Sequence, residues 1–224
     1  MALRAPFEFE QWYHCFNRGI DKRGVFEDED DANRFLMLLY LANGTERVSL
    51  FNAHKPHLTK VFQEDRGKPI VAIGAYCLMP NHFHLLLREI SDGGITAFMQ
   101  KLGTAYTMYF NAKNDRVGSL FTKPFRSRRV GTDRYFQHVL QYIHCNPAEL
   151  YEPGWKSGKV RNMNALAKKL LDYPYSSLGN YAGKRANPVL SSDGFEVANQ
   201  QPILRMLEEA RSYYAEVASD KFER

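Results

Sequence analysis

A hairpin of two apolar segments in the middle of the chain limits the folds that are open to it. Residues 70–78 (IVAIGAYCL) and 82–88 (HFHLLLR) have strand-like composition and are separated only by the turn Met79-Pro80-Asn81. A link this short joins antiparallel neighbours, because parallel strands need a crossover of about a dozen residues or more. The sequence therefore predicts a hairpin, and the strongly apolar face of 82–88 predicts a central position in the sheet.

The segments on either side of the hairpin complete a known order. Residues 12–17 (WYHCFN) and 125–130 (FRSRRV) are typical of strands, whereas 31–42 and 95–112 carry apolar residues at helical spacing. The resulting order, β-α-β-β-α-β, is that of the ferredoxin-like plan. We therefore predict an α+β fold with an antiparallel sheet and helices on one face.

The rest of the chain is less regular. We interpret residues 45–68 as an insertion, 173–181 (YPYSSLGNY) as an aromatic loop that packs on the body, and 201–217 as a final helix. Hydrophobic residues make up 44% of the 224 residues, which is enough for one core of ordinary size. We expect one domain over residues 1–181 and a helical C-terminal extension over residues 182–224.

Composition disfavours several classes of protein. No stretch approaches the roughly 18 apolar residues that cross a bilayer. The charged start MALRAPFEFEQ is unlike a secretory signal, so we expect a cytoplasmic location. Cys15, Cys77 and Cys145 are widely spaced and odd in number, which argues against a disulfide scaffold or a cysteine zinc site.

Positive charge is concentrated in one part of the chain. The formal net charge is +5, and the segment 101–145 alone holds eight Lys and Arg residues against two Asp residues. Such a concentration favours a polyanionic partner, although a solvated basic surface would have the same composition.

His82 and His84 are the first candidates for chemistry. They lie two residues apart on a predicted strand, so their side chains point to the same face and two imidazoles can share one cation. Phe83, Leu85 and Leu87 then point into the core. A bare His-x-His pair is weak evidence for a metal, because two structural histidines give the same pattern.

A predicted helix over 134–146, capped by residues 131–133 and ended by Pro147, supplies the next candidates. Tyr142 and Asn146 are four residues apart and stack one turn from each other. One interpretation is a half-buried core tyrosine followed by a helix end-cap. The other is a tyrosine held beside a metal, with the amide oxygen of Asn146 as a ligand.

Several motifs occur together and in a fixed order over residues 12–181. They are HCFNRG (14–19), LMPNHFHLLL (78–87), GSLFTKPFRSRRV (118–130), QYIHCNP (141–147) and YPYSS (173–177). With them the chain resembles the single-tyrosine HUH endonucleases of the IS200/IS605 transposase superfamily, and most of all the REP-associated tyrosine transposases. Departures from the pattern, such as AELYEPGW after residue 147, concern substrate detail.

The resemblance implies a role for each candidate. His82 and His84 would be the HUH pair, Tyr142 the nucleophile and Asn146 the third ligand of Mg²⁺ or Mn²⁺, although the histidines alone would also accept zinc or nickel. The implied reaction cleaves hairpin-bearing single-stranded DNA through a 5′-phosphotyrosine and rejoins it, in the cytoplasm and in association with the nucleoid. The sequence leaves open whether Tyr142 serves its own subunit or the partner in a homodimer.

Basic residues near these motifs are the candidates for phosphate contacts. They are Arg18, Lys123, Arg126, Arg128 and Arg129. Strand alternation puts Arg126 and Arg128 on one face and Arg129 on the other, so not all of them can contact one DNA strand.

Some residues and functions compete with this interpretation. Tyr106 and Tyr109 are alternative tyrosines, and His138 and His144 could assist proton transfer, although capping or surface roles are more common for such histidines. A non-catalytic nucleic-acid-binding domain of ferredoxin-like fold and a metal-dependent hydrolase that uses water are the alternative functions. A regulatory cover over the active site is one hypothesis for residues 182–224.

Overall fold

A computed structural model describes residues 6–46, 57–122, 124–157, 159–184, 187–198 and 201–210. Its four strands form one antiparallel sheet in the order β2-β3-β1-β4. They are β1 (Trp12–Arg18), β2 (Val71–Met79), β3 (His82–Glu89) and β4 (Arg126–Val130). Helix α1 (Glu29–Leu41) connects β1 to β2, and α3 (Gly94–Lys113) connects β3 to β4. The predicted ferredoxin-like order, the hairpin and the central position of β3 are confirmed.

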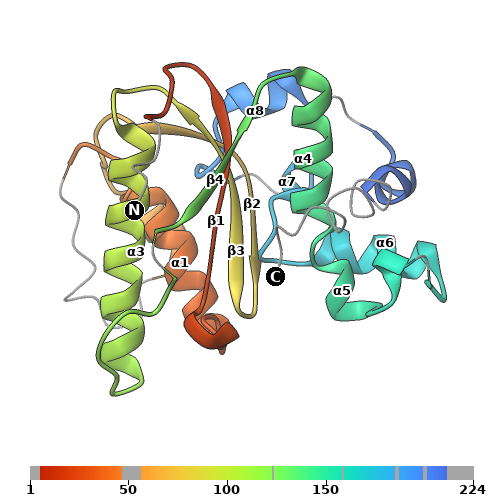
Figure 1. Ribbon diagram of the computed structural model, residues 1–224, viewed down its shortest axis with the longest axis horizontal. Helices are drawn as coiled ribbons and strands as arrows, with labels where there is room; N and C mark the ends of the chain where they lie inside the picture. Colours follow the sequence, from red (N-terminus) through yellow and green to blue (C-terminus); the bar gives the residue numbers. More distant parts are fainter. Residues whose placement is uncertain are drawn as a thin grey trace.

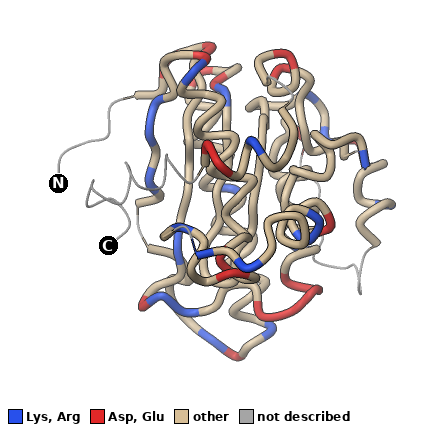
Figure 2. Tube along the Cα trace, turned by 90° about the vertical axis from the view of Figure 1, so that its right-hand side faces the viewer, with Lys and Arg blue, Asp and Glu red and all other residues tan. Residues whose placement is uncertain are grey.

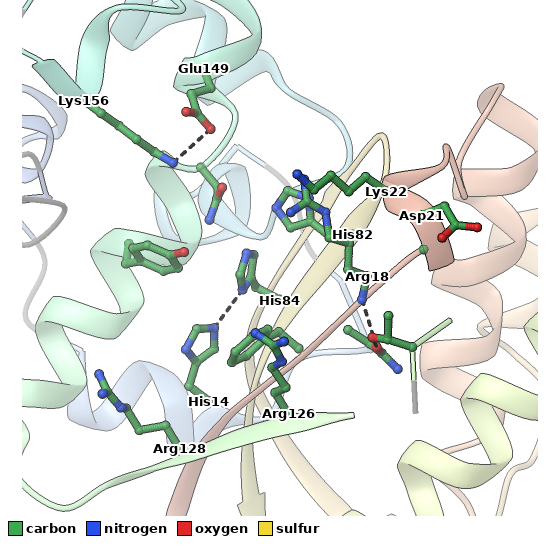
Figure 3. Close-up of a pocket in the computed structure, with 16 residues that line it drawn as sticks. His14, Arg18, Asp21, Lys22, His82, His84, Arg126, Arg128, Glu149 and Lys156 are labelled. Atoms are coloured by element: carbon green, nitrogen blue, oxygen red, sulfur yellow. Dashed lines mark hydrogen bonds and ion pairs between the residues drawn. The ribbon is translucent and has the colours of Figure 1, made fainter. Parts of the chain in front are cut away.

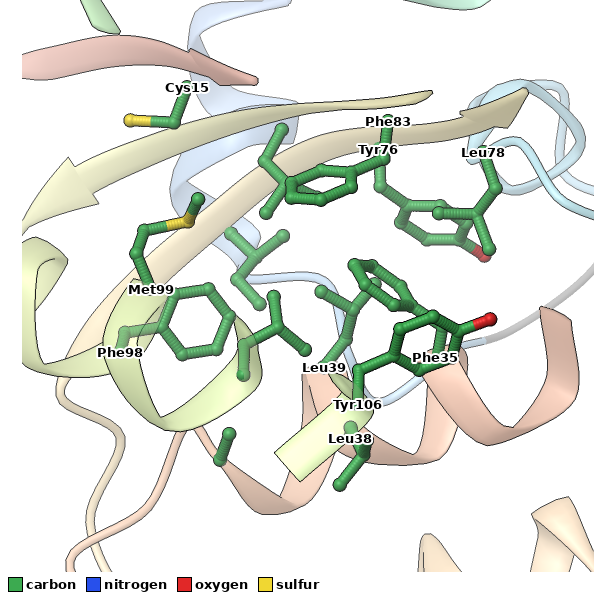
Figure 4. Close-up of a cluster of buried hydrophobic side chains, with 14 of the residues drawn as sticks. Cys15, Phe35, Leu38, Leu39, Tyr76, Leu78, Phe83, Phe98, Met99 and Tyr106 are labelled. Carbon is green, nitrogen blue, oxygen red and sulfur yellow. The ribbon is translucent and has the colours of Figure 1, made fainter. Parts of the chain in front are cut away.

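Helices α1 and α3 cover one face of the sheet (Figure 1). Strand alternation turns Phe83, Leu85 and Leu87 to this face, where they join a buried cluster with Phe35 and Tyr106 (Figure 4). Helix α1 begins two residues earlier than the sequence predicted, because the Asp28 side chain accepts a hydrogen bond from the Asp31 N–H at 2.9 Å and caps the helix.

Helix α4 (Asp133–Cys145) lies on the opposite face of the sheet (Figure 1). The Thr132 side chain caps it by accepting a hydrogen bond from the Tyr135 N–H. Its apolar face packs against Trp12 and Leu86 of the sheet in a second buried cluster. The sheet therefore has a core on each side, and α4 is the predicted extra helix that carries Tyr142.

Short elements that the sequence did not predict complete this second layer. They are α5 (Ala148–Tyr151), the 3-10 helix η2 (Trp155–Ser157), α6 (Met163–Asp172), α7 (Leu178–Tyr181) and α8 (Ser192–Val197). The segment expected to be an aromatic loop packs its tyrosines on the body and also pairs with the edge of β2. The Leu78 N–H donates to the Tyr175 carbonyl at 2.9 Å, and the Ser177 N–H donates to the Tyr76 carbonyl at 3.0 Å.

The predicted insertion and the final helix are only partly covered. Residues 47–56 lie outside the described residues, and the following stretch contains α2 (Leu58–Val61), which packs on α1. Residues 203–210 are helical, whereas 211–217 lie outside the description. Within the described ranges, no helix combines the length and the apolar character that a bilayer crossing requires. The division at residue 181 stays a prediction.

Candidate functional site

A pocket of about 420 Å³ opens on the face of the sheet that α4 covers (Figure 3). Strands β1, β3 and β4 form its floor, α4 forms one wall, and the 3-10 helix η1 (Ile20–Lys22) follows β1 at its rim. His82, His84, Tyr142 and Asn146 all line it. Residues that are far apart in the sequence and were predicted separately therefore meet in one cavity.

The histidine pair reaches the pocket because of the alternation in β3. The ring centroids of His82 and His84 lie 5.0 Å apart, and the two rings meet edge to face. Phe83, between them, points into the opposite core. His84 is buried, whereas His82 is half-buried at the mouth of the pocket.

A third histidine, His14 of β1, belongs to the same cluster. Its Nε2 atom lies 2.9 Å from Nδ1 of His84. On β1 the residues His14, Phe16 and Arg18 share one face, and the register sets Phe16 beside His84 and Arg18 beside His82. His14 lies in the motif HCFNRG, but the sequence predicted no role for it. Strand alternation gives only the face of β1 on which His14 lies, and the register of β1 against β3 brings it to His84.

Burial keeps these imidazoles uncharged. Desolvation, with smaller contributions from His82 and His14, lowers the pKa of His84 well below its usual range. Desolvation and the nearby Arg128 lower the pKa of His14 to about 3. Both rings are therefore neutral at neutral pH, and neutral imidazole is the form that binds metal ions.

Tyr142 and Asn146 enter the pocket from α4. The Tyr142 ring packs edge-on against His84, with centroids 5.3 Å apart, and against His14, with centroids 5.6 Å apart. Asn146 follows the last residue of α4 and is buried. The spacing of these two residues by one helical turn thus turns both of them to the pocket.

The donor set fits a divalent cation. Within the part of the chain that the structure describes, Nε2 of His84 and Nδ2 of Asn146 are buried and have no hydrogen-bond partner, which is costly unless a ligand satisfies them. The two atoms of an amide are interchangeable by a flip, so the oxygen of Asn146 can face the same space. No group of three or more His, Cys, Asp or Glu side chains in the described ranges is arranged to hold a metal.

Basic side chains from separate segments surround these residues. Arg18, Arg126 and Arg128, three of the candidates for phosphate contacts, line the pocket together with Lys22 and Lys156, which the sequence did not indicate. The buried Nε atom of Arg18 has no hydrogen-bond partner in the described ranges, and Lys156 forms a 3.0 Å ion pair with Glu149 at the rim. Lys and Arg positions are spread along the trace, with Asp and Glu among them (Figure 2). The fold brings the pocket-lining basic residues together from separate segments.

Of the two remaining candidates for phosphate contacts, one lies away from the pocket and one is not described. Arg129 points to the other face of β4, where it forms a 2.9 Å ion pair with Glu8 and a 3.1 Å hydrogen bond to Gln11. Lys123 lies outside the described residues.

The competing residues are engaged elsewhere. The Tyr106 hydroxyl donates to the Val25 carbonyl and the Tyr109 hydroxyl to Asp31, both on the side of the sheet that α1 and α3 cover. His144 is buried, with Nε2 2.8 Å from the Ser177 hydroxyl oxygen. Neither His144 nor His138 lines the pocket.

Comparison with known proteins places this geometry in a context. The family model described as IS200-like transposase matches residues 9–146, a range that begins just before β1 and ends at Asn146. A solved structure of a REP-associated tyrosine transposase bound to a REP hairpin is similar, with 12% sequence identity, a TM-score of 0.47 and coverage of 90% of this chain and 98% of that chain. No curated protein matches significantly.

Proposed function

The chain belongs to the family of IS200-like transposases, which process DNA, and we propose that it cuts and rejoins single-stranded DNA with Tyr142 as the nucleophile. One observation carries this proposal. Tyr142 and Asn146 of α4 line the same pocket as His82 and His84 of β3, with arginine side chains around them.

His82 and His84 would hold Mg²⁺ or Mn²⁺ through their Nε2 atoms, and Asn146 would hold it through its amide oxygen. When bound, the ion supplies a Lewis acid that polarises the non-bridging oxygens of the phosphate. Two imidazoles and an amide carry no charge, so these ligands leave the positive charge of the site available to the substrate. Arg18 and Arg126 orient the same phosphate from the β1 and β4 side.

Tyr142 attacks the phosphorus that these groups orient. A phenol with a pKa near 10 is a weak nucleophile at neutral pH, so packing of its ring against His84 and His14 contributes by fixing its direction. The bond from the phenolic oxygen to phosphorus forms while the bond from phosphorus to O3′ breaks. The phenolic proton leaves, and the departing O3′ takes up a proton. The products are a 5′-phosphotyrosine and a free 3′-hydroxyl, and a second 3′-hydroxyl reverses the step without ATP.

The remaining basic side chains bind the strand on both sides of the reacting phosphate. Arg128 extends the β4 side of the pocket, whereas Lys22 and Lys156 lie at the rim. Contacts of this kind bind the backbone without reading the base sequence. We take a hairpin-bearing repetitive sequence as the substrate from the resemblance of the motifs.

A covalent adduct is the decisive test. Wild-type protein incubated with labelled hairpin-bearing single-stranded DNA and Mn²⁺ should give a protein–DNA adduct that survives SDS. Tyr142→Phe should abolish the adduct and retain binding. Tyr109→Phe, which removes a hydroxyl on the other side of the sheet, should leave the adduct unchanged.

Each other outcome points to a different function. An adduct that persists in Tyr142→Phe contradicts the assignment of the nucleophile. Cleavage without an adduct favours a hydrolase that uses water, and binding without cleavage favours a non-catalytic nucleic-acid-binding domain.

A further inference from the structure

The two candidate ligand histidines share one arrangement that the family assignment does not describe. Nδ1 of His82 lies 2.7 Å from Oδ1 of Asn81, the last residue of the turn between β2 and β3. Nδ1 of His84 lies 2.9 Å from Nε2 of His14 on β1. In each ring, therefore, Nδ1 has a partner from the protein.

The contacts of Asn81 determine where the proton of His82 lies. The Nδ2 group of Asn81 donates to the Lys22 carbonyl at 3.2 Å. A carbonyl oxygen only accepts hydrogen bonds, so the amide nitrogen must face Lys22 and the amide oxygen must face His82. This oxygen also only accepts, so Nδ1 of His82 must carry a hydrogen. A neutral imidazole has a single N–H, which leaves the lone pair on Nε2.

A strained loop holds the Lys22 carbonyl in place. Asp21 and Lys22 have φ values of 56° and 59°. Residues other than glycine rarely adopt this left-handed region. The Gly19 N–H donates to the Asn81 carbonyl at 2.9 Å, and the Val25 N–H donates to the Pro80 carbonyl at 2.8 Å. Such backbone strain persists only where its surroundings over-determine it. Here the two hydrogen bonds link the loop after β1 to the turn before β3.

We propose that Asn81 and His14 are positioning residues, which hold His82 and His84 in the tautomer whose Nε2 lone pairs face the pocket. His84 provides a second observation, because its buried Nε2 has no hydrogen-bond partner among the described residues. If Nδ1 of His84 donates to Nε2 of His14, the Nε2 atom of His84 carries a lone pair that is available to a cation. Histidines that bind metals usually donate their other N–H to an acceptor in this way. The inference rests on the proposed function for the identity of the ligand, but the tautomers are a property of the protein alone.

The first measurement needs neither metal nor DNA. Nitrogen NMR of the full chain with ¹⁵N-labelled histidine distinguishes protonation at Nδ1 from protonation at Nε2. We expect His82 and His84 to be protonated at Nδ1. Protonation of His82 at Nε2 in the wild-type protein would overturn the proposal, even if every variant failed to fold.

The second measurement is the affinity for Mn²⁺, measured by calorimetry without DNA. Asn81→Ala should give His82 a mixture of tautomers and weaken Mn²⁺ binding by about 10- to 100-fold. Asn162→Ala removes the capping asparagine of α6, away from the pocket, and should change neither reading. Asn81→Asp retains an acceptor for His82 and should bind Mn²⁺ more tightly than Asn81→Ala.

His14 is tested by a matched pair of substitutions. His14→Phe keeps a flat ring but removes the acceptor, so Mn²⁺ affinity should fall, whereas His14→Gln offers an acceptor and should restore part of it. Unchanged affinity in both Asn81→Ala and His14→Phe would refute the proposal. Because no DNA is present, these results are independent of the adduct. Expected tautomers without an adduct would overturn only the proposed function.

Discussion

At the scale of single residues, the direction of each side chain on a strand decides which charges serve the pocket. Arg126 and Arg128 line it, whereas Arg129, between Arg128 and Val130 on the same short strand, is paired with Glu8 on the other face. All three were candidates for phosphate contacts by sequence. Their geometry now separates them into two groups with different expected effects on DNA binding.

Arg126→Gln should weaken binding of single-stranded DNA and make it less dependent on salt. Each phosphate contact with a single strand contributes roughly −0.7 to the slope of log affinity against log salt concentration, so the slope should become shallower by about that amount. Fluorescence anisotropy over a range of NaCl concentrations measures it. Arg129→Gln is the matched control and should leave the slope at the wild-type value. Equal effects of the two substitutions would contradict the assignment of faces.

How well the site could be predicted from the sequence depended on how local each pattern is. His82 and His84 are two residues apart on a strand, and Tyr142 and Asn146 are one helical turn apart. The regular period of a strand or a helix therefore places the members of each pair on the same face. His14 was missed because its contact with His84 depends on the register of β1 against β3, across 70 residues of sequence. Lys156 was missed because it lies in an irregular segment with no period.

At the scale of elements, a buried carboxylate joins the two helices that cover the far face of the sheet. Nζ of Lys113, in the last turn of α3, lies 2.6 Å from Oδ1 of Asp31 and 2.6 Å from Oδ2 of Asp28 at the start of α1. The Asp31 side chain is fully buried, and the Tyr109 hydroxyl also donates to it. Acidic residues at a helix start and a basic residue at a helix end both complement the helix dipoles.

Lys113→Met should destabilise the protein by about 1–3 kcal/mol at pH 7, because it removes a charged hydrogen-bond donor from a buried carboxylate. Urea unfolding followed by circular dichroism measures the change. Lys101→Met, on the same helix, removes a hydrogen bond to the Gly44 carbonyl and should have the smaller effect.

The loss of stability caused by Lys113→Met should also shrink in acid. The hydrogen bond from Lys113 lowers the pKa of Asp28, so the stability it provides is present above the usual pKa of about 3.9 and is lost as the pH falls through the lowered value. A loss of stability independent of pH would argue against this ion pair.

The same contrast between local and distant patterns applies to the elements. Helix α4 was predicted almost to the residue, since its apolar positions repeat over 13 residues and Thr132 caps it. Helices α5 and α7 have four residues each, too few for a repeat to be visible. Tyr175 and Ser177 pair with β2 through backbone groups, and no side-chain pattern records such pairing.

At the scale of the whole molecule, the C-terminal part packs against α4, the helix that carries Tyr142. Gln137 of α4 donates to the Val197 carbonyl at 2.6 Å, and Gln141 donates to Glu209 at 2.5 Å. Leu207 is fully buried in the same cluster as Tyr142. None of the residues from 182 to 210 that the structure describes lines the pocket. These described residues therefore give no support to a cover over the pocket, and they contact α4 instead.

A helix held this way should present its tyrosine to the histidines of its own chain. His84→Ala and Tyr142→Phe, each expected to form no adduct alone, provide the test when they are mixed. If a homodimer exchanged α4 between subunits, the mixture would combine an intact tyrosine with an intact histidine pair and regain the adduct. Because Tyr142 packs against His84 and His14 within one chain, we expect no adduct from the mixture at any ratio. Recovery of about a quarter of the wild-type adduct, as random exchange of subunits and one competent site in each mixed dimer would give, would show that the tyrosine acts on the partner.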